Sequence, residues 1–124
     1  MRWLVAILLA VSQAWVYAGE QPGGSVLVQV SFVTGLQHHG ANKAFDKLKV
    51  GDALQLEREP HNPDDPNAIR VEWRGRTLGY VSADQNESIA RQIDFGNRLR
   101  ARVVRLSKHR NPDRRVEIEI YLPF

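Results

Sequence analysis

A short segment between two predicted strands carries the side chains best suited to hold a ligand. Its polar members are Asn62, Asp64, Asp65 and Asn67, and its prolines are Pro60, Pro63 and Pro66. Each proline fixes φ and removes a backbone donor, so neither a helix nor a continuous strand ladder runs through the segment. The polar side chains can cap a turn by bonding nearby amides, or they can face a ligand from fixed positions. Both interpretations are open from the residues alone.

Histidines and aspartates in the same part of the chain raise the alternative of a metal site. They are His38, His39, His61, Asp64 and Asp65. These side chain types ligate zinc and other divalent ions, but adjacent histidines diverge, and the chain has neither cysteine nor a His-Glu-x-x-His motif. No Gly-x-Ser-x-Gly and no Gly-x-x-x-x-Gly-Lys sequence is present either. We therefore expect no metal, no cofactor and no catalytic residues.

The segment also resembles a known family. The block Asn62-Pro63-Asp64-Asp65-Pro66-Asn67-Ala68-Ile69-Arg70-Val71, followed by Gly79-Tyr80, resembles the HIRAN domain over about residues 25–124. The resemblance implies an OB-like β-barrel that binds single-stranded DNA at a free 3′ end. Hydrolytic activity in relatives belongs to fused ATPase domains, so the resemblance implies a non-catalytic binding module here.

The resemblance also implies a set of nucleic-acid-binding residues: Gln37, His38, His39, Asn62, Asp64, Asp65 and Tyr80. In the family, aromatic side chains of a loop after the first strand stack on bases, and His38 and His39 occupy that loop here. Asp65 corresponds to the residue that contacts the terminal sugar hydroxyl. Asp64 stands where the family often has tyrosine. Base stacking contributes roughly 1–3 kcal/mol per base, so these departures lower the expected affinity.

Basic residues gather toward the C-terminus. Arg98, Arg100 and Arg102 recur with period two and are predicted to share one face of a strand. They can follow a phosphate backbone, or they can pair with Glu117 and Glu119 on the neighbouring strand, which we favour for Arg100 and Arg102. The next hairpin carries Lys108, Arg110, Arg114 and Arg115. Its charges suit either a phosphate backbone or an anionic membrane surface.

These side chains must be positioned by a small β-rich domain. Period-two alternation predicts half-buried strands near residues 26–33, 54–56, 69–73, 78–80, 99–103 and 116–122. Ser82 and Gln85 form a capping-box pattern, which predicts one helix over residues 83–95 that ends at Gly96. A short helical turn is expected near Ala44 and Phe45. Six strands around one clear helix predict a small antiparallel β-barrel of the all-β or α+β class.

The N-terminus has the pattern of a secretory signal peptide. Arg2 precedes an apolar stretch over residues 3–11, and Val16-Tyr17-Ala18 fits a cleavage site. The stretch is shorter than the roughly 20 residues that a membrane span needs. We therefore expect a signal peptide at 1–18, a flexible leader at 19–24, the domain at 25–124, and a secreted or periplasmic protein.

The charge balance leaves two kinds of partner open. The chain of 124 residues has 17 Lys and Arg against 14 Asp and Glu, a net charge of +3, which is mild for a nucleic-acid binder. The resemblance favours single-stranded DNA. The expected export favours the alternative of an envelope protein-interaction module that kept the barrel and lost DNA binding.

Overall fold

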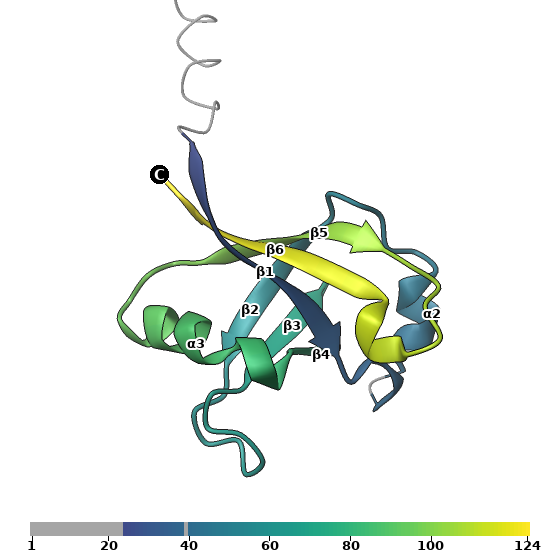
Figure 1. The fold of residues 1–124 in the computed structure, drawn as a ribbon, viewed down its shortest axis with the longest axis horizontal. Coiled ribbons are helices and arrows are strands. Elements are labelled where there is room, and N and C mark those ends of the chain that lie inside the picture. The colour runs from purple at the N-terminus through teal and green to yellow at the C-terminus, as the bar shows by residue number, and fades with distance from the viewer. Residues whose placement is uncertain (1–23, 39) are drawn as a thin grey trace, which may run out of the picture.

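Six antiparallel strands close into a barrel in this computed structural model, which describes residues 24–38 and 40–124 (Figure 1). The strands are β1 (Ser25–Thr34), β2 (Ala53–Arg58), β3 (Ile69–Trp73), β4 (Arg76–Val81), β5 (Arg100–Leu106) and β6 (Val116–Pro123). Around the barrel they run in the order β1-β4-β3-β2-β5-β6. The predicted fold class is confirmed. The expected signal peptide at 1–18, most of the leader at 19–24, and His39 lie outside the described residues.

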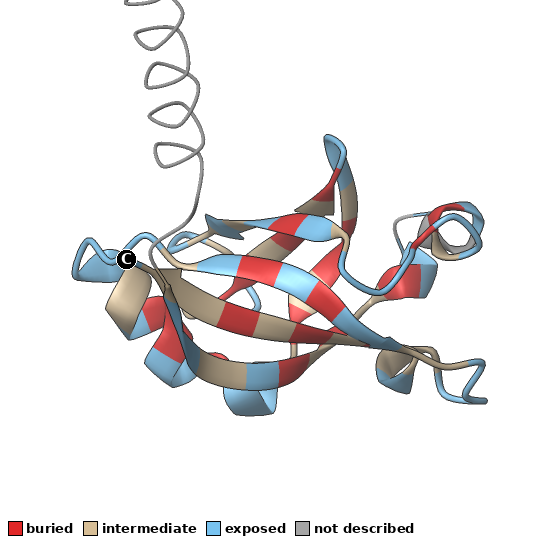
Figure 2. Cartoon of the chain, turned by 90° about the horizontal axis from the view of Figure 1, so that it is seen from above, coloured by how far each residue is buried: buried red, intermediate tan, exposed pale blue. Residues whose placement is uncertain are grey.

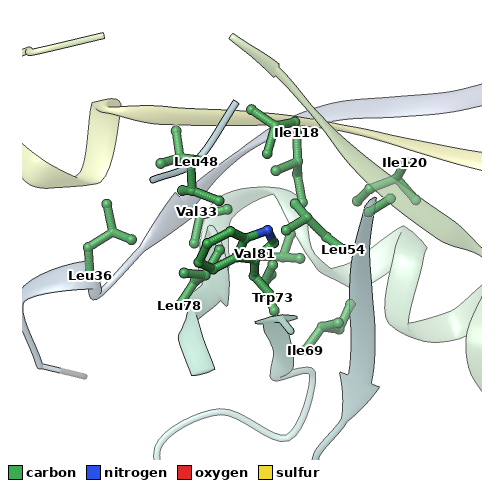
Figure 3. Packing of buried hydrophobic residues seen from close by; sticks show 14 of the residues in the cluster. Val33, Leu36, Leu48, Leu54, Ile69, Trp73, Leu78, Val81, Ile118 and Ile120 are labelled. Atoms are coloured by element: carbon green, nitrogen blue, oxygen red, sulfur yellow. The ribbon is translucent and has the colours of Figure 1, made fainter. Parts of the chain in front are cut away.

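The core follows from alternation along the strands (Figure 2). In β6, Val116, Ile118 and Ile120 are fully buried, whereas the residues between them are only partly covered. Side chains at every second position of a strand share one face, so these three project together into the barrel. They meet apolar side chains from the other strands and from the segments that cover the barrel ends (Figure 3).

Strand β1 is present as predicted, but its buried face differs from a simple alternation of valines. Ser31 and Val33 are buried, while Val26 and Val30 are 52% and 42% exposed. The register with β6 shifts between Leu27 and Gln29, and such an irregularity changes which side chains face inward. The first half of the strand therefore extends along β6 beyond the main core (Figure 1).

The predicted single helix over residues 83–95 is wrong. The chain forms a 3-10 turn, η2 (Ala83–Gln85), and then a separate helix, α3 (Glu87–Asp94). The side-chain oxygen of Gln85 is 3.4 Å from the backbone nitrogen of Phe32 in β1, so it serves a neighbouring strand rather than a capping box. The predicted end is confirmed, because Gly96 has φ +101° and donates its N–H to the carbonyl of Ile93.

Three short helical segments complete the described chain: η1 (Leu36–His38), α2 (Ala41–Phe45) and η3 (Pro112–Arg114). The second of these is the helical turn expected near Ala44. Across residues 24–38 and 40–124, no helix is both long and apolar enough to span a membrane.

The three arginines predicted to share one face of a strand, Arg98, Arg100 and Arg102, are only partly placed as predicted. Arg102 forms an ion pair with Glu119, which confirms the cross-strand interpretation for that residue. Arg100 lies opposite Tyr121 rather than a glutamate, and Arg98 precedes the strand. Arg105 takes the place opposite Glu117, because the register shifts between Val103 and Arg105.

Candidate functional site

The turn between β2 and β3 is held by its own side chains. Asn62 accepts hydrogen bonds through Oδ1 from the backbone nitrogens of Asp64 (2.9 Å) and Asp65 (3.2 Å). Asp65 in turn accepts one through Oδ1 from the nitrogen of Asn67 (2.8 Å). The capping interpretation is therefore confirmed for Asn62 and Asp65. The same bonds hold both side chains in one orientation beside the barrel.

Glu59 anchors this turn to the barrel wall. Its Oε1 accepts hydrogen bonds from Asn62 Nδ2 (3.0 Å) and the Tyr80 hydroxyl (2.9 Å), and its Oε2 accepts one from Arg70 (2.6 Å). The Asn62 hydrogen bond, helped by Tyr80 and Arg70, lowers the pKa of Glu59. Burial, followed by the bond to Glu59, raises the pKa of Tyr80. Glu59 therefore stays ionised at neutral pH and holds Asn62 and Tyr80 together.

Asn86 holds the other oxygen of Asp65. Its Nδ2 donates to Asp65 Oδ2 at 2.8 Å, and the residue is 2% exposed. Asn86 occupies the N-cap position of α3, yet within the described chain its side chain makes no capping bond to that helix. An asparagine at an N-cap ordinarily stabilises its helix through such a bond. Here the side chain is directed to the Asp65 carboxylate instead.

A close backbone contact brings β1 against β4 at this point. A Cβ atom at Gly79 would lie 2.1 Å from the carbonyl oxygen of Thr34, so only glycine fits. The contact places Thr34 directly opposite Tyr80 in the strand register. Close packing of β1 against β4 therefore explains why residue 79 is a glycine. The same packing places Thr34 beside Tyr80 in the site.

These residues surround a pocket of about 370 Å³. Its lining residues are Thr34, Asn62, Asp64, Asp65, Ala68, Tyr80, Val81, Ala83 and Asn86. Two carboxylates, two amides, a hydroxyl and a phenol ring surround small apolar side chains. Among the described residues that line it, none is basic. The pocket can accept hydrogen bonds from hydroxyl or amine groups and can pack against a planar or sugar ring, and it is electrostatically unfavourable for a phosphate.

The structure brings together four of the predicted site residues: Asn62, Asp64, Asp65 and Tyr80. Gln37 and His38 are exposed on η1, and neither belongs to the described lining of the pocket. His39 lies outside the described residues. In the part of the chain that the structure describes, no three His, Asp or Glu side chains are grouped as metal ligands.

The sequence did not predict that Glu59 and Asn86 belong to the site. Glu59 directly precedes Pro60, and nothing in its local spacing indicates the hydrogen bonds that it accepts. Asn86 is a residue type typical of helix starts, placed inside a predicted helix, and that conflict was the available signal. Both act through hydrogen bonds to residues 21 positions away in the chain.

The fold is a small closed β-barrel with a polar pocket beside the β2–β3 turn. The family model of the HIRAN domain matches residues 26–124, and the chain belongs to this family. HIRAN domains are DNA-binding modules and are not catalytic.

Two solved structures are similar to this chain. The crystal structure of a protein from Lactobacillus plantarum is 28% identical, with a TM-score of 0.72, and the match covers 81% of this chain and 96% of that one. The crystal structure of the HIRAN domain of human HLTF is 23% identical, with a TM-score of 0.60, and covers 81% and 79%. The second likeness concerns the fold alone. No curated protein matches the chain.

Proposed function

We propose that this chain binds the 3′ end of a single-stranded nucleic acid in the pocket beside the β2–β3 turn. The observation that carries the proposal is the Asp65 carboxylate, which is held at the pocket wall by Asn86 on one oxygen and by the Asn67 nitrogen on the other. Each carboxylate oxygen has two lone pairs, so a fixed carboxylate with one donor per oxygen can still accept from a sugar hydroxyl. Membership of a DNA-binding family supports the same ligand class.

The charge of the pocket supports a free hydroxyl over a terminal phosphate. Asp64 and Asp65 both line it, and a phosphate placed between them would meet two negative charges without a counter-charge in the described lining. The Tyr80 ring and the small side chains of Ala68 and Val81 offer apolar contact to the sugar and base. A neutral terminal nucleoside fits this combination.

The loop residues contact the strand outside the pocket in this proposal. Gln37 and His38 are exposed on η1, and their side-chain Nε2 atoms lie 3.4 Å apart. A histidine ring can stack on a base, although with a smaller face than tyrosine. We assign Gln37, His38 and His39 to a base upstream of the terminal nucleotide.

The test is fluorescence anisotropy with the purified chain and three probes. The probes are a short single strand with a free 3′ hydroxyl, the same strand with a 3′ phosphate, and a blunt duplex. We expect the first to bind most tightly. Equal binding of the two single strands would contradict the pocket assignment, and no binding to any probe at low salt would redirect the search to envelope proteins.

Two variants connect the result to Asp65. Asp65→Ala should abolish the preference for the free 3′ hydroxyl, and Asp65→Asn, which retains an acceptor for the turn, should weaken that preference while the fold is kept. Glu57→Gln is the matched control, because it removes one negative charge from an exposed position on β2. A preference that survives in Asp65→Ala would refute the assigned role.

We further propose that the chain is exported. The apolar stretch at 3–11 and the Val16-Tyr17-Ala18 sequence support a signal peptide that is cleaved after Ala18. The intact mass of the protein recovered from cells should correspond to a chain that begins at Gly19. A mass that retains the first 18 residues would contradict cleavage.

A further inference from the structure

Five arginines of the described chain form ion pairs with carboxylates: Arg58, Arg70, Arg91, Arg102 and Arg105. Arg74, Arg76, Arg98 and Arg100 form none with a described residue. The β5–β6 hairpin gathers further unpaired cations in one short segment. Its four basic side chains, which we call the hairpin cations, are Lys108, Arg110, Arg114 and Arg115. None of the four forms an ion pair with any described residue. Asp46, Asp84 and Asp113 line the hollows beside these four cations, so this end of the barrel carries a small excess of positive charge.

The hairpin that carries these charges is held in one shape. Asn111 accepts a hydrogen bond through Oδ1 from the nitrogen of Asp113 (3.0 Å), and Arg115 Nε donates to the carbonyl of His109 (2.8 Å). The acid of the hairpin, Asp113, accepts through Oδ1 from the nitrogen of Gly35 (3.0 Å) and so fastens the hairpin to the end of β1. A loop ordered in advance loses less conformational entropy when it binds a ligand.

A second hollow connects the pocket to the hairpin, and a third lies against the hairpin. The second hollow, of about 420 Å³, shares Thr34 and Ala83 with the pocket, and its charged lining residues are Asp84, Asp113 and Arg114. The next residue, Arg115, lines the third hollow, of about 340 Å³, together with Lys108, Phe45 and Asp46. In Figure 1, η3 is the short yellow coil before β6, and it lies beside the end of β1. A chain that leaves the pocket through the second hollow thus meets the hairpin.

We propose that the hairpin cations hold the phosphate backbone of the strand whose 3′ end lies in the pocket. This inference rests on the proposed function and adds a second contact surface to it. A pocket lined by carboxylates cannot neutralise a polyanion, so the phosphates need cations elsewhere. Arg114 is the first cation along this path, but Asp84 and Asp113 line the same hollow, so Lys108, Arg110 and Arg115 beyond it must supply most of the attraction in this proposal. An anionic membrane would not require that connection to the pocket, so the geometry favours the strand.

The experiment measures how affinity depends on salt. Binding of the free-hydroxyl strand is followed from about 50 to 200 mM salt, and the slope of log K against log salt is compared between variants. The test variant is Arg110→Ala with Arg114→Ala. The control is Arg98→Ala with Arg100→Ala, which removes the same charge from exposed positions at the start of β5, away from the hairpin.

We expect the slope to become shallower by about 1.4 in the hairpin variant, at about 0.7 per lost phosphate contact on a single strand. The preference for a free 3′ hydroxyl should be retained, because the pocket is untouched. The control variant should keep the slope of the wild-type protein. Equal changes in the two double variants would mean that only total charge matters, and would overturn the inference.

The possible failures are distinguishable. A wild-type preference for the free hydroxyl with an unchanged slope in the hairpin variant would keep the proposed function and refute the hairpin contact. A shallower slope without any hydroxyl preference in the wild-type protein would refute the pocket and keep the phosphate contact. If the wild-type protein binds vesicles of an anionic phospholipid but no strand, and the hairpin variant loses that binding, both proposals are wrong.

Discussion

Asn86 donates a 2.8 Å hydrogen bond from Nδ2 to Oδ2 of Asp65 and so joins the start of α3 to the β2–β3 turn. The two residues come from segments that neither strand pairing nor a shared helix connects. Because the Asn86 side chain makes this contact and no capping bond, α3 lacks the roughly 1 kcal/mol of stabilisation that an N-cap hydrogen bond ordinarily supplies. The contact fixes Oδ2 of Asp65 at the wall of the pocket.

Asn86→Ala should weaken ligand discrimination as well as stability. The change leaves Asp65 with one donor, so we expect the free energy of unfolding to fall by about 1–3 kcal/mol and the free-hydroxyl preference to shrink. Denaturant unfolding and anisotropy measure the two effects. Asn97→Ala, at an exposed position after α3, is the control. A fully retained hydroxyl preference in Asn86→Ala would show that the Asn67 nitrogen alone positions Asp65.

A double-mutant cycle tests whether Asn86 acts through Asp65. If it does, Asn86→Ala should cost little more in binding once Asp65→Ala is present, with a coupling energy of about 0.5–3 kcal/mol. Additive losses in affinity would place the effect of Asn86 elsewhere in the barrel.

Acid should weaken the barrel through Glu59. Its folded pKa is lowered below the ordinary value of 4.5, first by the Asn62 hydrogen bond and then by Tyr80 and Arg70. A lowered folded pKa means that this stabilisation is fully present above about pH 4.5 and is lost as the pH falls through the lowered value. Urea unfolding measured from neutral to acid pH should show this loss.

Glu59→Gln isolates that acid effect. The amide cannot ionise, so the variant should be less stable at neutral pH and should show a smaller decline in acid. Glu57→Gln, on the exposed face of the same strand, should decline as the wild-type protein does. If all three proteins lose stability in parallel, the acid sensitivity arises from other carboxylates.

Gly79→Ala should destabilise the barrel strongly. The added Cβ would lie 2.1 Å from the carbonyl oxygen of Thr34, a backbone atom that cannot turn aside. Overpacking costs about 1–3 kcal/mol or more, and the melting temperature should drop by roughly 4 °C or more. Gly24→Ala is the matched control. Its Cβ would meet the Phe124 ring at 2.8 Å, but that residue is 74% exposed and can move away.

Arg58→Lys should loosen the last turn of α3 from the barrel. Arg58 donates through two nitrogens to both carboxylate oxygens of Asp94 (2.9 and 3.0 Å) and through a third to the carbonyl of Ala68 (2.9 Å). A lysine has one nitrogen and cannot reproduce this arrangement, so we expect Arg58→Lys to lower the melting temperature measurably. Arg91→Lys, in an exposed pair with Glu87, should change stability by less than about 0.5 kcal/mol. Thermal unfolding of both variants gives the comparison, and equal losses would contradict a special role for Arg58.

Much of the fold could be predicted because its causes are local. The alternation of Val116, Ile118 and Ile120 predicts a strand with one buried face, and β6 has that face. The asparagine and aspartate of the turn predict caps, and Asn62 and Asp65 make them. In each case the interacting groups lie within a few residues of one another, so their spacing carries the information.

Local patterns were misleading where a distant segment competed for the same groups. The capping-box pattern at Ser82 and Gln85 predicts one long helix. Instead, the Gln85 side chain lies against Phe32 of β1, and Asn86 separates η2 from α3. The register shift in β1 likewise follows from pairing with β6 rather than from its own alternation. Tertiary contacts overrode the local preference in both places.

By itself, the sequence determined the six strands and, for most of them, which side chains face inward. It also determined that the turn between β2 and β3 is capped and that it is part of a candidate site. Only the tertiary structure decided that Glu59 and Asn86 hold that site, that Thr34 joins it, and that Gln37 and His38 lie outside the pocket. The physical reason is the range of the interactions. Period and turn chemistry act between near neighbours, whereas a hydrogen bond between residues 21 or more positions apart exists only once the barrel has closed and brought them together.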